Sequence, residues 1–275
     1  MTPPPRSELS RSLGLWDAIA IGVASMVGAG VFAVWAPAAQ AAGSWFLAGL
    51  VIAALVAWAN ATSSAQLAAQ YPSAGGTYVY GRERLGAWPG FLAGWSFVVG
   101  KMSSVAAMAL TFAAYLAPDG WAKPIAIGVV WVLVGINCLG VTRTAQAAKV
   151  LVVLSLIGLA VALGYGWVNS AATTAAFGWI EPTGGVYGVL QSAGLLFFAF
   201  AGYARIATMG EEVRDPKRTI GRAIITALGI VLVLYVVVGV SLLTLFGPEK
   251  LALSTAPLTL LADGNPVVLG ILLAG

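Results

Sequence analysis

The chain alternates between long stretches without any charged residue and short clusters of charge. An α-helix crosses the roughly 30 Å hydrocarbon core of a bilayer with about 20 apolar residues, and the uncharged stretches are long enough for that. They also lack the alternating, roughly ten-residue pattern of a membrane β-barrel. The pattern therefore predicts an all-α membrane protein. Its complete spans are expected at about residues 15–40, 44–69, 88–116, 123–141, 147–168, 185–206 and 222–246, with an eighth that begins near Pro266.

Composition supports the membrane prediction and excludes several classes of site. Hydrophobic residues make up 60% of the 275 residues and charged residues only 9%, against roughly 25% charged residues in an average soluble protein. The absence of histidine excludes histidine-ligated metals and histidine general bases. The single cysteine, Cys138, excludes intrachain disulfides and thiolate metal clusters. Because the spans also lack paired carboxylates and nucleophile–base motifs, we expect no enzyme activity, no metal, no cofactor and no nucleic-acid partner.

Basic residues predict the orientation, because loops that stay in the cytoplasm are enriched in Lys and Arg. With a cytoplasmic N-terminal tail, residues 1–13, only Lys123 and Lys250 fall on the far side of the membrane. The sequence is therefore expected to be a multi-pass protein of the cell membrane, embedded in the lipid bilayer, with its N-terminus in the cytoplasm. Ten basic residues then lie on the cytoplasmic side: Arg6, Arg11, Arg82, Arg84, Arg143, Lys149, Arg214, Lys217, Arg218 and Arg222.

The first span contains two glycines at mid-membrane, Gly28 and Gly30. Each weakens a helix by up to about 1 kcal/mol relative to alanine. Unwound backbone at that depth is tolerated only where it lines a cavity inside the protein. There its N–H groups and the positive end of the following half-helix suit a carboxylate, and its carbonyl groups suit an ammonium group. Close packing of small residues explains the same glycines, and the first span alone does not decide between the two.

The sixth span favours the binding interpretation, because Gly202 interrupts it at mid-depth behind the aromatic cluster 197–200. Spans one and six are equivalent if the fold repeats after five helices, and an odd number of helices inverts the second copy in the membrane. Paired interruptions in two inverted halves are the best sequence indication of a transporter binding site. The predicted division is a first five-helix repeat at 14–170 and the start of a second, inverted repeat at 171–275.

Three segments carry more specific information. The first is GAGVF at 28–32, the second is YPSAGGTY at 71–78, and the third combines FFAFAGY at 197–203 with EEVRDPKR at 211–218. In this order, and at these positions relative to the spans, they resemble the amino acid–polyamine–organocation (APC) superfamily, in its amino acid permease branch. The second segment is similar to that family's Y-P-x-A-G-G-x-Y stretch between helices two and three.

The resemblance implies a LeuT-like fold, a five-plus-five inverted repeat, that carries out secondary active transport of amino acids by alternating access. It implies that backbone N–H groups at 28–30 bind the substrate carboxylate and that carbonyl groups near Met26, Phe198 and Ala201 hold the amino group. It also implies that the ring of Phe198 or Phe200 gates the site. The candidate substrate-binding residues are Ser25, Met26, Gly28, Ala29, Gly30, Phe198, Phe200, Ala201 and Gly202.

Two basic residues are candidates for coupling. Lys101 lies deep in the third span, where a charge is costly and usually faces a cavity or a partner. It is expected either to take part in coupling, with the proton as the predicted ion, or to act as a static tether. Some relatives carry a lysine on the fifth helix, at a position within 155–159 where this chain has none. Arg205 is expected either to pair with Glu211 or Glu212 or to anchor one end of the sixth span.

Two further features of the sequence, the residue at 204 and the end of the chain, lead to expectations about the substrate and about transport. Some relatives have an acidic residue where Ala204 stands, so a neutral amino acid is the expected substrate. The chain stops at Gly275 within the eighth span, so we expect a C-terminally truncated permease with an incomplete second repeat, which by itself would transport poorly. The alternative is a non-transporting membrane scaffold or a degenerate permease fragment.

Overall fold

The computed structural model describes residues 13–71, 75–118, 120–138, 141–170 and 184–274; for Ala29 and for 141–149 it describes the backbone alone. Every regular element in this part of the chain is a helix, and one isolated β-bridge joins Leu13 to Val213. Six helical segments of the described residues are long and apolar enough to cross a membrane. The prediction of an all-α membrane protein is confirmed.

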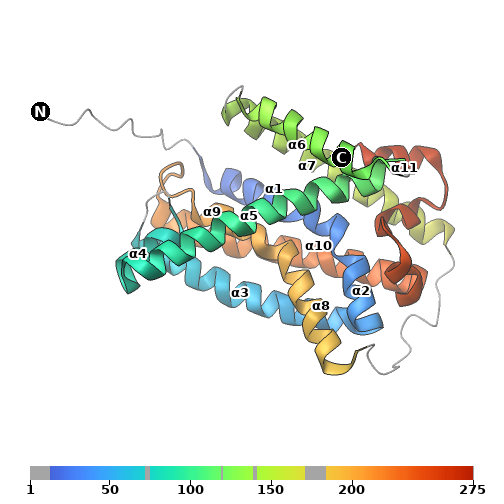
Figure 1. Ribbon diagram of the computed structural model, residues 1–275, viewed down its shortest axis with the longest axis horizontal. Helices are drawn as coiled ribbons and strands as arrows, with labels where there is room; N and C mark the ends of the chain where they lie inside the picture. The colour runs from blue at the N-terminus through green and yellow to red at the C-terminus, as the bar shows by residue number, and fades with distance from the viewer. Residues whose placement is uncertain (1–12, 72–74, 119, 139–140, 171–183, 275) are drawn as a thin grey trace, which may run out of the picture.

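The helices follow one another along the chain as labelled in Figure 1. The α-helices are α1 (Leu15–Ala33), α2 (Trp35–Ala42), α3 (Phe46–Gln70), α4 (Thr77–Leu85), α5 (Ala87–Leu116), α6 (Ala122–Cys138), α7 (Val141–Asn169), α8 (Gly185–Phe200), α9 (Ala204–Ala207), α10 (Pro216–Leu253) and α11 (Pro266–Leu273). The short 3-10 helices are η1 (Gly43–Trp45), η3 (Ala201–Tyr203) and η4 (Pro257–Ala262).

An inner bundle of α1, α2, α3, α8 and α10 holds most of the main hydrophobic core (Figure 1). α3 packs against both α8 and α10, and α1 packs against α10. Small side chains let helix backbones approach closely, which is the usual basis of helix packing within a membrane. A Cβ atom at Gly49 of α3 would overlap the hydroxyl of Ser192 on α8. The buried face of α3 is made largely of such small residues: Gly49, Ala53, Ala57, Ala61, Ala65 and Ala68.

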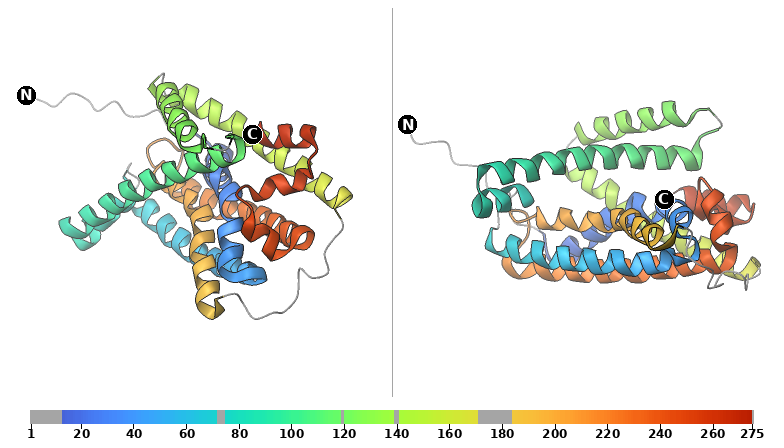
Figure 2. Two further views of the ribbon diagram at one scale, coloured as in Figure 1. Left: turned by 45° about the vertical axis from the view of Figure 1, so that its right-hand side comes forward. Right: turned by 60° about the horizontal axis from the view of Figure 1, so that its bottom comes forward.

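A second layer, which contains α4, α5 and α6, lies outside this bundle, and α5 and α6 run above it in the right-hand view of Figure 2. α5 packs against α4 and α6. Its outer face carries Trp88, Phe91 and Trp95, each more than half exposed and stacked ring on ring. Exposed apolar surface of this kind suits a lipid environment, because lipid tails are as apolar as the side chains themselves.

The observed helix boundaries differ from the predicted spans at particular places. The span expected at 123–141 is α6, whose 17 residues rise about 26 Å at 1.5 Å per residue. α10 begins at Pro216 rather than near residue 222, because proline is preorganised for the first turn of a helix and the charged residues that follow it continue that turn. Residues 1–12 and 171–183 lie outside the described residues, so the tail and the division into inverted repeats stay predictions.

Both helices expected to break are interrupted. α1 leaves helical geometry at Gly28, where φ is −40° and ψ is −119°. α8 ends at Phe200 and passes through the 3-10 turn η3 before α9 resumes the helix. The second interruption is therefore a tightened turn rather than a freely unwound segment. Its backbone stays hydrogen-bonded, since the N–H of Ala201 donates to the carbonyl of Phe198.

Candidate functional site

The two interrupted helices touch each other through their backbones. A Cβ atom at Gly202, in η3, would lie 2.7 Å from the Met26 nitrogen and overlap the Ser25 carbonyl. A Cβ atom at Gly30 would lie 2.8 Å from the Cα atom of Ala199. Glycine at these two positions is required by close approach, so the packing explanation of the glycines holds for Gly30 and Gly202.

Gly28 has a different environment. It is exposed, and no atom of another segment lies within 4 Å of the place where its Cβ would be. Packing therefore does not explain Gly28. The glycine at the point where α1 leaves helical geometry instead faces open space.

Tyr235 on α10 connects the two interrupted helices, and the sequence did not single it out. Its hydroxyl oxygen lies 2.6 Å from the carbonyl oxygen of Met26 and 3.1 Å from that of Ala199. The side chain is fully buried, with its ring 5.1 Å from the ring of Phe200 and 6.1 Å from that of Trp35. One signal was available: Tyr235 is the one aromatic hydroxyl in the charge-free stretch 223–248.

A cavity of about 460 Å³ lies beside this contact, between α1, α3, α5, α8 and η3. Pockets that bind small molecules usually measure roughly 300–1,000 Å³ and combine apolar walls with a few polar groups. Its lining residues include seven that the sequence nominated: Ser25, Met26, Gly30, Lys101, Phe198, Ala201 and Gly202. Polar residues not nominated for the site also line it: Asn60, Ser96, Ser104 and Tyr203.

Other nominated residues lie elsewhere. Phe200 is fully buried against Tyr235, so Phe198 is the one of the two candidate gating rings that faces the cavity. Arg205 follows η3 beyond the cavity lining. The side chain of Ala29 lies outside the described residues.

The carbonyl groups expected to hold a substrate amino group already accept one hydrogen bond each. The Met26 carbonyl is contacted by the Tyr235 hydroxyl, and the Phe198 carbonyl accepts from the Ala201 N–H. The Ala201 carbonyl accepts from the Ala204 N–H. A carbonyl oxygen has two lone pairs and can accept more than one hydrogen bond.

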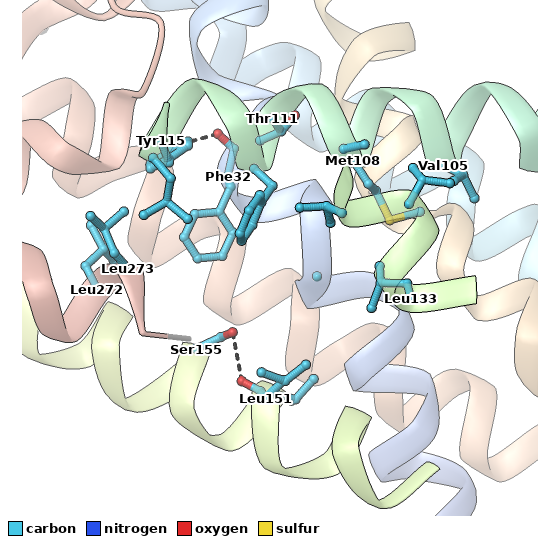
Figure 3. Close-up of a pocket in the computed structure, with 17 residues that line it drawn as sticks. Phe32, Val105, Met108, Thr111, Tyr115, Leu133, Leu151, Ser155, Leu272 and Leu273 are labelled. Atoms are coloured by element: carbon cyan, nitrogen blue, oxygen red, sulfur yellow. Dashed lines mark hydrogen bonds between the residues drawn. The ribbon is translucent and has the colours of Figure 1, made fainter. Parts of the chain in front are cut away.

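Gly28 lines a second cavity, of about 380 Å³ (Figure 3). Its walls are mainly apolar side chains of α5, α6, α7 and α11. The Tyr115 hydroxyl donates to the Phe32 carbonyl over 3.1 Å, and the Ser155 hydroxyl donates to the Leu151 carbonyl within its own helix. Residues of α1 around the interruption thus line two different cavities, one partly polar and one mainly apolar.

Comparison with known proteins identifies the family of the chain. The profile of the family described as amino acid permease matches residues 13–272. The chain belongs to this family. An uncharacterized transporter of Mycobacterium tuberculosis (strain ATCC 25618 / H37Rv) is 54% identical over 252 residues, which are 92% of this chain and 57% of that protein.

Two further relatives of the chain carry names that state a substrate class. Cationic amino acid transporter 7, chloroplastic, of Arabidopsis thaliana is 29% identical over 91% of this chain and 47% of its own length. The branched-chain amino acid permease BcaP of Bacillus subtilis (strain 168) is 25% identical over 84% of this chain and 54% of its own. The chain spans about half the length of the curated relatives it matches.

Polar contacts gather where the chain enters α1. Arg205 forms an ion pair with Glu212 at 3.7 Å, one of its two expected partners, and donates to the Thr208 hydroxyl. The Leu13 N–H donates to the Glu212 carbonyl over 3.1 Å, which ties the start of α1 to the loop after α9. Tyr80 of α4 donates to the Ala207 carbonyl over 3.4 Å, and burial raises the pKa of its hydroxyl.

Proposed function

We propose that this permease transports amino acids across the cell membrane by alternating access, with the substrate zwitterion bound where α1 and η3 meet. The observation that carries the proposal is the backbone contact of Gly202 with Ser25 and Met26 beside a cavity of about 460 Å³. Two helices interrupted at mid-depth, in contact and next to a cavity, are the arrangement of a transporter site. The N-terminus is cytoplasmic in this proposal, following the ten-to-two bias of basic residues.

The backbone of the interrupted helices supplies the groups that every amino acid needs. N–H groups at 28–30 bind the carboxylate, because the half-helix that follows carries a partial positive charge at its start. The remaining acceptor sites of Met26, Phe198 and Ala201 bind the amino group, with the Ser25 hydroxyl close by. The ring of Phe198 shields the bound zwitterion from water and attracts its ammonium group.

The expected substrates are neutral amino acids and the expected coupling ion is the proton. No acidic side chain is present among the residues that line the cavity, which disfavours an additional positive charge on the substrate. Lys101 in the cavity wall is the candidate for proton exchange. Arg205, paired with Glu212 outside the cavity, is the candidate for holding the entrance of the site in one arrangement.

The test is uptake of radiolabelled amino acids by vesicles that contain the protein, with an inward proton gradient, with a sodium gradient and with neither. We expect saturable uptake of at least one neutral amino acid, several-fold faster with the proton gradient. A protein that is helical and monodisperse but neither binds nor takes up any amino acid would contradict the proposal and support a non-transporting scaffold. Uptake driven by sodium alone would contradict proton coupling and leave transport intact.

A further inference from the structure

The cavity between α1, α5 and α8 has a single formal charge among the residues that line it. That charge is the ammonium group of Lys101, and the other lining residues include neither Asp nor Glu. The side chain comes from the middle of α5, a helix of 30 residues, at the depth where the other helices are interrupted. A substrate in this cavity therefore meets one fixed positive charge.

The ammonium group of Lys101 has an aromatic contact and no ion pair. Its Nζ atom lies 5.6 Å from the centre of the Phe97 ring, which also lines the cavity. Within the described part of the chain, no carboxylate forms an ion pair with it. A contact with a ring face attracts a cation more weakly than an ion pair does. The charge is thus free to pair with a bound anion.

The two walls of the cavity have different roles. The interrupted helices offer backbone groups, which can bind only what all amino acids share, the carboxylate and the amino group. The opposite wall is one face of α5, with side chains spaced about four residues apart: Ser96, Phe97, Gly100, Lys101, Ser104 and Met108. Residues four apart lie on the same face of a helix. This face is left to contact the substrate side chain.

We propose that Lys101 binds the side-chain carboxylate of dicarboxylic amino acids, so that the site accepts glutamate or aspartate in addition to neutral amino acids and rejects cationic ones. The proposal rests on the transport function proposed above. Opposite charges a few ångströms apart attract and like charges repel, more strongly the less water lies between them. The expected discrimination that depends on Lys101 is about 10- to 100-fold in affinity.

The experiment compares L-glutamate with L-glutamine, which has the same shape without the charge, and with L-arginine. Dissociation constants are measured by titration of the purified protein for the wild type, Lys101→Met and Lys101→Arg. Lys250→Met is the matched control, because the Lys250 ammonium lies 5.1 Å from the Phe246 ring at the same four-residue spacing but outside this cavity. The measured quantity is the affinity for glutamate divided by that for glutamine.

We expect this ratio to fall at least about tenfold in Lys101→Met, and arginine binding to strengthen by a similar factor. Lys101→Arg keeps the charge and should keep the ratio within about threefold, as should Lys250→Met. Both ligands are measured on one preparation, so the ratio does not depend on the fraction of folded protein. If Lys101→Met binds neither ligand, the affinities of the wild type provide the test. A higher affinity for glutamate than for arginine then supports the proposal.

Two results would overturn the proposal and leave the proposed transport function standing. One is an unchanged ratio in Lys101→Met. The other is a wild-type protein that binds neutral amino acids and prefers arginine to glutamate. Failure of the wild type to bind any amino acid would overturn both proposals together, so the two can be told apart.

Discussion

The hydroxyl oxygen of Tyr235 lies 2.6 Å from the carbonyl oxygen of Met26, two residues before the interruption in α1. The same hydroxyl lies 3.1 Å from the carbonyl oxygen of Ala199, just before η3. One buried side chain of α10 thus holds the ends of both interrupted helices. A backbone that leaves helical geometry has acceptor groups that need partners inside a membrane, and Tyr235 supplies one.

Removal of this hydroxyl should destabilise the protein. In Tyr235→Phe the ring and its contacts with Phe200 remain, but the two buried carbonyl groups lose the one O–H donor within their reach. The expected cost is about 1–3 kcal/mol, the range for a buried polar group left without its partner. Thermal unfolding of the purified protein measures it. Tyr187→Phe is the control, because Tyr187 is 75% exposed and its loss should leave the unfolding temperature unchanged.

An equal melting temperature in Tyr235→Phe and the wild type would show that the hydroxyl does not hold the interrupted helices. Lower stability of Tyr235→Phe together with tighter amino acid binding would indicate that the hydroxyl competes with the substrate amino group for the Met26 carbonyl.

The contact at Gly202 makes a sharp steric prediction. In Gly202→Ala the new methyl group would overlap the backbone at Ser25, and backbone cannot move aside as a flexible side chain can. We expect a loss of stability of about 1–3 kcal/mol, as for overpacked sites, and loss of amino acid binding. Gly229→Ala on α10 is the control, since nothing lies within 4 Å of its Cβ position. If Gly202→Ala still binds amino acids, the contact between η3 and α1 is not required for binding.

Lys101 allows proton coupling to be tested apart from recognition of the side chain. The guanidinium group of arginine keeps its charge and does not release a proton in proteins. With a neutral substrate such as L-glutamine, we therefore expect Lys101→Arg and Lys101→Met both to lose the acceleration of uptake by a proton gradient. Full proton-driven uptake in Lys101→Met would show that the proton is carried elsewhere.

Hydropathy predicted the helices well because burial in lipid imposes a length and a composition on every span. The interruptions at Gly28 and Gly202 were also predictable, since glycine weakens a helix whatever surrounds it. The sequence could not separate the roles of Gly28 and Gly30. One faces open space and the other contacts Ala199, and that difference depends on which helix lies opposite.

Tyr235 was missed for the same reason. It lies on a different helix from the groups it contacts, 209 residues from Met26, and no local pattern records such a contact. The structure places Lys101 in the cavity wall, without an ion pair among the described residues, and its role in coupling or as a tether stays a prediction.

The two aromatic candidates in α8 should behave differently when truncated. Phe200 is fully buried against Tyr235, whereas Phe198 lines the cavity. We expect Phe200→Ala to lower stability by about 2–3 kcal/mol, below the 3–5 kcal/mol of soluble cores, because lipid rather than water surrounds the unpacked helices.

Phe198→Ala should change stability by less than about 1 kcal/mol, because a side chain at a cavity has fewer packing partners to lose. Its effect should fall on amino acid affinity, by roughly tenfold, since the ring face that attracts the substrate ammonium is removed. Thermal unfolding and ligand titration on the same two preparations separate the effects. Unchanged affinity in Phe198→Ala would mean that its ring does not act at the site and that the aromatic cluster serves only to pack α8.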